Sequence, residues 1–100
     1  MMRLVVNGRD AAAYSGGVPF DAARPAVVLL HGALNDHSVW SLTGRYLAHH
    51  GWAVLALDQP GHGQSAGPAL ASVEALADWT LACLDAAGAR RAALVGHSLG

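Results

Sequence analysis

The feature that most constrains this chain is a set of three short apolar runs, at residues 26–30, 52–57 and 92–95, which contain no charged or strongly polar residue. A strand with one face in water alternates between apolar and polar residues, whereas a strand covered by helices on both faces does not. All three runs are also shorter than a typical helix. The sequence therefore predicts three buried strands of one sheet, covered on both faces.

The segments between these runs have helical periodicity. From residue 38 to residue 50 apolar side chains recur three, four and seven positions apart, and Gly51 supplies a helix stop. These apolar positions are Val39, Trp40, Leu42, Tyr46 and Leu47. A second helix is predicted from the N-cap Ser72 to Gly88, with a single apolar face. That face comprises Val73, Leu76, Ala77, Leu81 and Leu84. The order strand, helix, strand, helix, strand favours right-handed parallel crossovers.

The N-terminal part precedes this alternation and has a different pattern. Residues 3–6 and 11–14 flank Asn7 and Gly8, a pair that tolerates positive φ at both central positions of a tight turn. We therefore expect an antiparallel hairpin, separated from the core by the turn-forming residues 15–19.

Composition narrows the class of protein further. The chain has 100 residues, which suits one domain over residues 1–100, and 53% of them are hydrophobic against 13% charged. The net charge is −1 and the basic residues are dispersed arginines, so no nucleic-acid partner is expected. No run approaches the ~20 apolar residues of a membrane span and no secretory signal begins the chain, so we expect a cytoplasmic protein without a membrane partner. Cys83 is the only cysteine and is predicted to be a buried thiol.

Residues 96–100, G-H-S-L-G, follow the third apolar run directly and match the pattern G-x-S-x-G. A nucleophile at a sharp turn from strand to helix has a strained backbone, and small residues two positions before and after it let neighbouring elements approach without a clash. Gly96 and Gly100 meet this demand. Ser98 is therefore the candidate nucleophile.

A serine hydroxyl is a weak nucleophile at neutral pH and needs a base, together with donors for the oxyanion that develops. One donor is expected to be the backbone N–H of Leu99, and the second must come from a loop that ends an adjacent strand. His31 and Gly32 follow the first apolar run, and Ala33 is then the natural residue to aim its N–H at the site. Open parallel sheets bind ligands at this carboxyl edge of their strands.

Three ordered motifs, at residues 31–33, 58–65 and 96–100, together resemble the α/β-hydrolase superfamily, in particular its serine esterase and lipase-like branch. The resemblance covers nearly the whole chain. It implies an α/β fold of which this chain is the N-terminal half, an antiparallel hairpin followed by β-α-β-α-β of a mostly parallel sheet. It also implies that Ser98 is the nucleophile of the elbow and that residues 31–33 form the oxyanion loop.

In this family the acidic residue and the histidine of the catalytic triad follow the serine, with a lid between them. Asp58, Asp78 and Asp85 all precede Ser98, so none of them is assigned that role. We therefore expect an incomplete core domain, truncated before the helix that follows the nucleophile and inactive by itself. The oligomeric state, and whether the natural chain ends at Gly100, are left open.

The resemblance implies that the full-length protein hydrolyses an ester, thioester or related acyl bond of a small apolar substrate through an acyl-serine intermediate at Ser98. Family members with a serine at this position also catalyse C–C bond hydrolysis, acyl transfer or perhydrolysis, so these reactions remain alternatives. A non-catalytic binding protein and an inactive fragment are further alternatives. The dehalogenase and epoxide hydrolase branches resemble the same scaffold but have an aspartate as nucleophile.

The six histidines lack a metal-ligand spacing such as H-E-x-x-H, and the chain has no lysine for a phosphate-binding loop, so neither a metal nor a cofactor is expected. His31 and His97 are expected to hydrogen-bond loop backbone, and Asp58 to tie its own loop. His62 either lines the pocket or is solvated. Trp40 either packs in the core or faces the pocket mouth.

Overall fold

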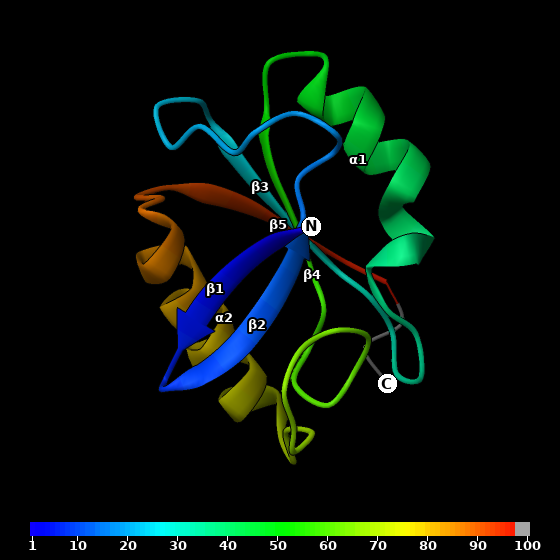
Figure 1. Ribbon diagram of the computed structural model, residues 1–100, viewed down its shortest axis with the longest axis vertical. Helices are drawn as coiled ribbons and strands as arrows, with labels where there is room; N and C mark the ends of the chain where they lie inside the picture. Colours follow the sequence, from blue (N-terminus) through cyan, green and yellow to red (C-terminus); the bar gives the residue numbers. More distant parts are fainter. Residues whose placement is uncertain (98–100) are drawn as a thin grey trace.

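The computed structural model describes residues 1–97, which form a mixed five-stranded sheet with helices on both faces (Figure 1). The strands are β1 (Met2–Val6), β2 (Arg9–Tyr14), β3 (Ala26–Leu30), β4 (Ala53–Leu57) and β5 (Ala92–Gly96). The helices are a short 3₁₀ turn, η1 (His37–Trp40), followed by α1 (Ser41–Ala48) and α2 (Val73–Ala87). The strand order in the sheet is β1-β2-β4-β3-β5. The predicted hairpin and the predicted alternation of strands and helices are confirmed.

The hairpin turns where the sequence predicts it. Asn7 and Gly8 have φ values of 52° and 78°, as a two-residue turn between twisted strands requires. The ladder extends up to the turn, so β2 begins at Arg9, paired with Val6, rather than at Ala11. β2 also pairs antiparallel with β4, which attaches the hairpin to the parallel part of the sheet.

The two strands at the centre of the sheet account for the continuous apolar runs. β3 pairs in parallel with both β4 and β5, and every residue of β3 and β4 is buried. Val28 and Leu55 face α2, whereas Val27 and Val54 on the opposite face pack with Ala48 of α1. Because both faces are covered, neither strand needs a polar position.

The third strand, β5, was predicted to be buried, and this prediction is wrong for the described residues. Leu94 is 58% exposed and Val95 is 40% exposed. β5 is an edge strand of the described sheet, paired only with β3, and among the described residues only its first residue, Ala92, packs against the core clusters. Its apolar sequence nevertheless matches that of a covered strand.

Helix α2 has the predicted ends and part of the predicted apolar face, because Leu76 and Leu84 pack against the core cluster. Ser72 accepts a hydrogen bond from the N–H of Ala75 at the N-cap, and Gly88 follows the helix with a φ of 75°. The buried residues are Trp79, Thr80 and Cys83, whereas the predicted face includes residues that are largely exposed, namely Val73 at 70% and Leu81 at 58%. The helix is apolar on more than one side, and its Trp79 side packs on β1, β3 and β4.

The first predicted helix is divided into η1 and α1. Asp36 caps η1 by accepting a hydrogen bond from the N–H of Ser38, α1 ends at Ala48, and Gly51 follows with a φ of 96°. The helical segment therefore begins and ends close to the predicted residues 38 and 50.

Small residues face the sheet from α1 together with the predicted Leu47, whereas two other predicted residues do not. Leu42 and Tyr46 are 82% and 63% exposed, and the buried residues of the helix are Gly44 and Ala48. A Cβ added to Gly16 would overlap Gly44 and Ala48, so the loop before β3 also lies directly against this helix. Close approach of helix, loop and sheet requires small side chains at these positions, which a periodicity of large apolar residues does not reveal.

Candidate functional site

Two loops meet at the carboxyl edge of the sheet, one after β3 (residues 31–36) and one after β4 (residues 58–72). β5 ends at the same edge, because Gly96 pairs with Leu30 and the N–H of His97 donates to the carbonyl of Leu30 at 3.1 Å. The predicted nucleophile and one predicted oxyanion donor, Ser98 and Leu99, lie outside the described residues. The described residues end at His97, which directly precedes them.

Asp58 is the central residue of this edge. Asp58 is fully buried. Its Oδ1 accepts two hydrogen bonds from His37, one from the backbone N–H at 2.7 Å and one from the ring Nδ1–H at 2.9 Å. Its Oδ2 accepts from the N–H of Gln64 at 2.9 Å. A Cβ on Gly63 would overlap the carboxylate, and Gly63 has a φ of 51°. The predicted role of Asp58 in its own loop is confirmed, and the bonds to His37 add a tie to the other loop.

His31 ties the same two loops together a second time. It is fully buried, and its Nε2 lies 3.0 Å from the backbone nitrogen of Gln59. Because that N–H can only donate, Nε2 is the acceptor, and Nδ1 carries the proton that is donated to the carbonyl of Gly32 at 2.7 Å. The side-chain amide of Gln59 donates in return to the carbonyl of His31. The predicted bonding of His31 to loop backbone is confirmed, and both of its ring nitrogens are occupied.

Ala33 lies in the turn between these ties. The N–H of Asn35 donates to the carbonyl of Gly32 at 3.3 Å, and Leu34 has a φ of 65° with a 95% exposed side chain. Ala33 lines a cavity of about 240 Å³ together with residues from the second loop and the start of α2. The remaining lining residues are Gln59, His62, Leu70, Ala71, Ser72, Val73 and Leu76. The oxyanion role of the Ala33 N–H stays a prediction.

His62 and Trp40 each had two alternative expectations, and the structure shows where both residues lie. His62 lines the cavity that Ala33 lines, and its ring lies 5.1 Å from that of His31. Trp40 packs on the apolar cluster beneath α1, and it also meets the ring of His97 edge-on at 6.3 Å. Its buried indole N–H has no hydrogen-bond partner among residues 1–97. The packing expectation for Trp40 is confirmed, and the expectation that it faces the pocket mouth stays a prediction.

Asp36, His37 and Asp58 bring three possible metal-ligand atoms within 4.8 Å of one another. All three residues already have hydrogen-bonding roles within the fold, because Asp58 accepts three N–H bonds, two of them from His37, and Asp36 caps η1. The hydrogen bonds from Ser38 also hold the pKa of Asp36 below its usual value. The cluster is a hydrogen-bonded joint between loops, which the sequence did not predict because the residues are far apart along the chain.

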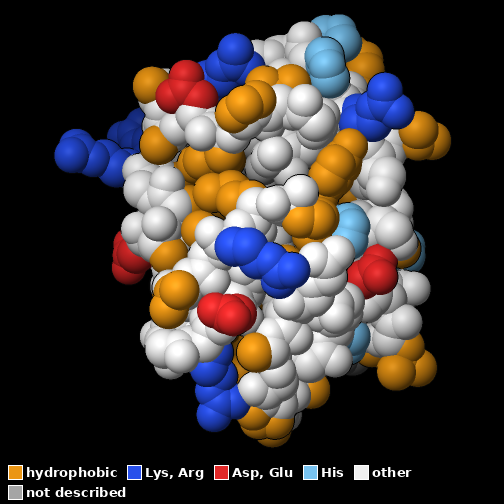
Figure 2. All heavy atoms as spheres, in the orientation of Figure 1, with side chains coloured by type: hydrophobic (Ala, Val, Ile, Leu, Met, Phe, Trp, Pro, Cys, Tyr) orange, Lys and Arg blue, Asp and Glu red, His pale blue; other side chains and the backbone are white. Residues whose placement is uncertain are grey.

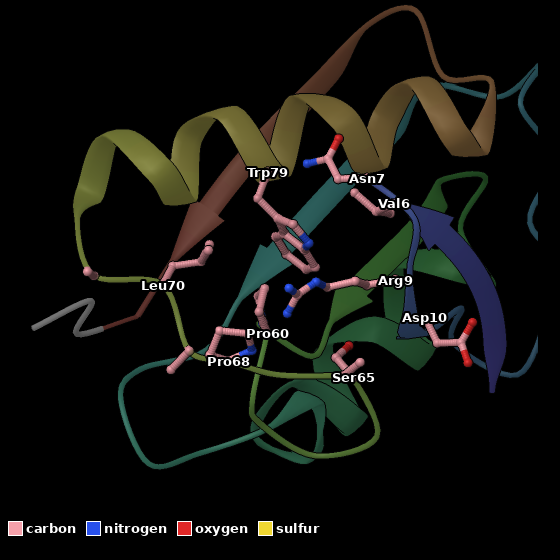
Figure 3. Close-up of a pocket in the computed structure, with 12 residues that line it drawn as sticks. Val6, Asn7, Arg9, Asp10, Pro60, Ser65, Pro68, Leu70 and Trp79 are labelled. Atoms are coloured by element: carbon pink, nitrogen blue, oxygen red, sulfur yellow. The ribbon is translucent and has the colours of Figure 1, made fainter.

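A separate cavity of about 300 Å³ lies between the hairpin turn and the second loop (Figure 3). Trp79 forms its inner wall, and Arg9 extends across it to donate to the carbonyl of Gly67. Ser65, also in its wall, accepts from the N–H of Ala12 and donates to the carbonyl of Asp58. These polar groups bond the loop to the sheet, so the cavity results from how the loop is attached.

The rest of the described structure adds little to the chemistry. Burial raises the pKa of the Cys83 thiol to about 12, so its predicted burial is confirmed and it is not a reactive thiolate. On the face in Figure 2, arginine and acidic side chains are interspersed rather than gathered by sign. Within residues 1–97, no helix combines the length and apolar character of a membrane span.

Comparison with known proteins agrees with this geometry. The family profile described as alpha/beta hydrolase fold matches residues 25–100. Over 75 residues the chain is 35% identical to (E)-2-((N-methylformamido)methylene)succinate hydrolase of Acinetobacter baylyi, which covers 74% of this chain and 28% of that protein.

Solved structures give the same result over almost the whole chain. A bacterial membrane phospholipase A superposes with a TM-score of 0.86 at 32% identity, covering 99% of this chain and 31% of that one. Epoxide hydrolase A of Mycobacterium thermoresistibile superposes with a TM-score of 0.80 at 30% identity, with the same coverage of 99% and 31%. The chain thus spans less than a third of each of these enzymes. Its sequence and its structure establish that it belongs to the α/β-hydrolase fold family.

Proposed function

We propose that the protein carrying this chain is a serine hydrolase that cleaves an ester, thioester or related acyl bond through an acyl intermediate on Ser98. The observation that carries this proposal is the convergence of β3 and β5 at one edge. The hydrogen bond from His97 to Leu30 brings the chain, one residue before Ser98, to the strand that leads into the loop of Ala33. A nucleophile and an oxyanion donor on adjacent strand ends are what acyl transfer requires.

The proposed reaction has two steps. Ser98 Oγ bonds to the acyl carbon, the bond to the leaving group breaks, and the serine proton passes through a histidine to the leaving group. Water then attacks the acyl-serine by the reverse proton route, releasing the acid and restoring Ser98. The N–H groups of Ala33 and Leu99 would stabilise the oxyanion in both steps.

The base for these steps is proposed to come from chain beyond these residues. His31 has both ring nitrogens engaged by backbone groups, so it has no free nitrogen to accept the proton of Ser98. The proposal of a later histidine otherwise rests on the family order, in which the histidine follows the serine.

A small apolar substrate is supported by the cavity next to Ala33. Leu70, Val73 and Leu76 contribute aliphatic side chains to its wall, while Gln59 and His62 contribute polar atoms. Binding sites for small molecules combine mostly apolar walls with a few polar groups in this way.

The relatives favour hydrolysis but differ in the bond they cleave. One solved relative is named a phospholipase A, which supports an ester substrate, and another is named an epoxide hydrolase. Ser98 favours the ester, because the epoxide hydrolase branch is expected to use an aspartate at this position. C–C bond hydrolysis, acyl transfer and perhydrolysis use the same serine and are distinguished by their products.

The test is covalent labelling of the protein that carries this chain with a fluorophosphonate, followed by peptide mass spectrometry. We expect one adduct on Ser98, its absence in Ser98→Ala, and an acylation burst with p-nitrophenyl acetate in the unmodified protein only. A folded protein that is neither labelled nor acylated would instead be a binding protein of the same fold.

A further inference from the structure

The carboxylate of Asp58 joins two loops that are far apart in sequence. It accepts two hydrogen bonds from His37, which directly follows the loop after β3, and one from Gln64 in its own loop. The side chain is fully buried, whereas the side chain of His37 is 20% exposed. A buried carboxylate in this position is stable only while its N–H partners remain in place.

Among residues 1–97, the loop after β3 has few other attachments. His31 fixes its first residue, and the backbone bond of Asn35 to Gly32 lies within the loop itself. Leu34 contributes no burial, because its side chain is 95% exposed, and its positive φ is unfavourable for a residue with a large side chain. The course of the loop between residues 31 and 37 therefore depends on the attachments at its two ends.

We infer that Asp58 is a positioning residue for acyl transfer, which acts through His37 to hold the loop that carries the Ala33 N–H. This inference rests on the proposed function, because it gives the bond between Asp58 and His37 a consequence for the oxyanion. Asp58 itself touches no reacting atom. It fixes the second end of the loop, while the bonds between His31 and Gln59 fix the first.

The position of the loop matters because an oxyanion donor acts over a narrow range of distances. Loss of one such donor lowers kcat by about 10²- to 10³-fold in serine hydrolases. Loss of the His37 ring bond leaves only its backbone N–H bond to Asp58, so the loop keeps its donor but holds it less firmly, and a smaller loss is expected. We expect kcat to fall about 10- to 50-fold, with KM changed by less than about threefold, because substrate binding in the ground state does not use this donor.

The experiment compares two substitutions of His37 in the protein that carries this chain. His37→Asn keeps an N–H donor near the position of Nδ1, whereas His37→Leu removes it. His50→Leu is the matched control, because His50 is exposed and, among residues 1–97, its ring contacts Tyr46, bonding to its carbonyl and stacking on its ring. Steady-state kinetics with p-nitrophenyl acetate, affinity for an aryl boronic acid and thermal unfolding are measured for all three variants.

We expect His37→Leu to lose kcat and boronate affinity together, His37→Asn to recover most of both, and His50→Leu to match the unmodified protein. Amide hydrogen exchange in a peptide covering residues 31–36 should accelerate only in His37→Leu. Unchanged kcat and unchanged exchange in a folded His37→Leu variant would overturn the inference. The inference would also be overturned if kcat fell in both His37 variants only in proportion to the fraction of protein that had unfolded.

Failure of the proposed function has a different signature. If the unmodified protein is not labelled at Ser98, acyl transfer is wrong and the catalytic role of the bond between Asp58 and His37 is wrong with it. If Ser98 is labelled and the exchange of the loop does not respond to His37→Leu, only the positioning role is wrong.

Discussion

The sheet core and the carboxyl-edge loops both contain fully buried side chains, but different interactions hold them. In the core, Leu29 and Leu55 lie on opposite faces of the sheet and are stabilised by many weak apolar contacts. At the edge, Asp58 and His31 are equally buried, and a few directed hydrogen bonds satisfy each of them.

Because different interactions hold the two regions, amino-acid substitutions are expected to affect them in different ways. An apolar side chain can be shortened at a cost that depends on its volume, and the neighbouring chains keep their places. A buried carboxylate is different, because a small chemical change leaves its former partners unsatisfied without changing its shape. The core therefore sets the stability of the fold, while the edge sets the position of a few backbone groups. Substitutions in the two regions should therefore have separable effects.

The largest effect on stability is expected from Leu55→Ala in β4. Leu55 is fully buried in the cluster beneath α2, and truncation of such a leucine costs about 2–5 kcal/mol of unfolding free energy. Urea denaturation measures the loss, and hydrogen exchange in residues 31–36 should increase no more than the global loss requires. Leu42→Ala is the matched control, because Leu42 is 82% exposed and its truncation should change stability by less than about 0.5 kcal/mol. A selective increase of exchange in the loop would contradict the separation of core and edge.

Asp58→Asn is expected to lower the unfolding free energy by less than Leu55→Ala does. Its effect on hydrogen exchange is expected to be local to the two loops. The amide oxygen can still accept from His37, but the amide nitrogen then faces the N–H of Gln64, so two donors oppose each other. One unsatisfied buried donor lowers the unfolding free energy by about 1–3 kcal/mol. Denaturation should report this loss, and hydrogen exchange should increase most at residues 31–37 and 58–64.

The same substitution at an exposed aspartate, Asp10→Asn, is the control, since exposed positions usually change stability by less than about 0.5 kcal/mol. If Asp58→Asn accelerated exchange uniformly through the sheet instead, the carboxylate would be part of the core rather than a tie between loops.

The parts of the fold that the sequence predicts are those with local causes. The hairpin turn follows from the backbone preferences of Asn7 and Gly8, and the ends of α2 follow from Ser72 and Gly88. The buried strands β3 and β4 follow from runs without a polar position. Each of these features can be recognised within a few residues of chain.

The parts that the sequence missed depend on which elements meet. The periodicity of α2 shows that the helix has apolar stripes, but not that Trp79 rather than Leu81 faces the sheet. In the same way, Ala33 was predicted from its place after a strand, whereas the bond between His37 and Asp58 links residues that no local pattern relates. A buried aspartate after a strand is a signal that some partner exists, but it does not say where that partner lies.

The smallest predicted effect, and the only stabilising one, concerns Leu34 at the tip of the loop after β3. Its φ of 65° is unfavourable for leucine and readily adopted by asparagine, and its side chain is 95% exposed. Leu34→Asn should therefore raise the unfolding free energy by about 0.5–1 kcal/mol, because it lowers the cost of a left-handed backbone at this position. The same substitution at exposed Leu42 in α1 should lower stability by about 0.5 kcal/mol, because asparagine is a poorer helix former. Thermal unfolding should therefore show a higher melting temperature for the Leu34 variant and a lower one for the Leu42 variant. Equal losses in both would show that Leu34 makes a stabilising contact outside the described residues, and the loop would then be held along its length rather than by its two ends.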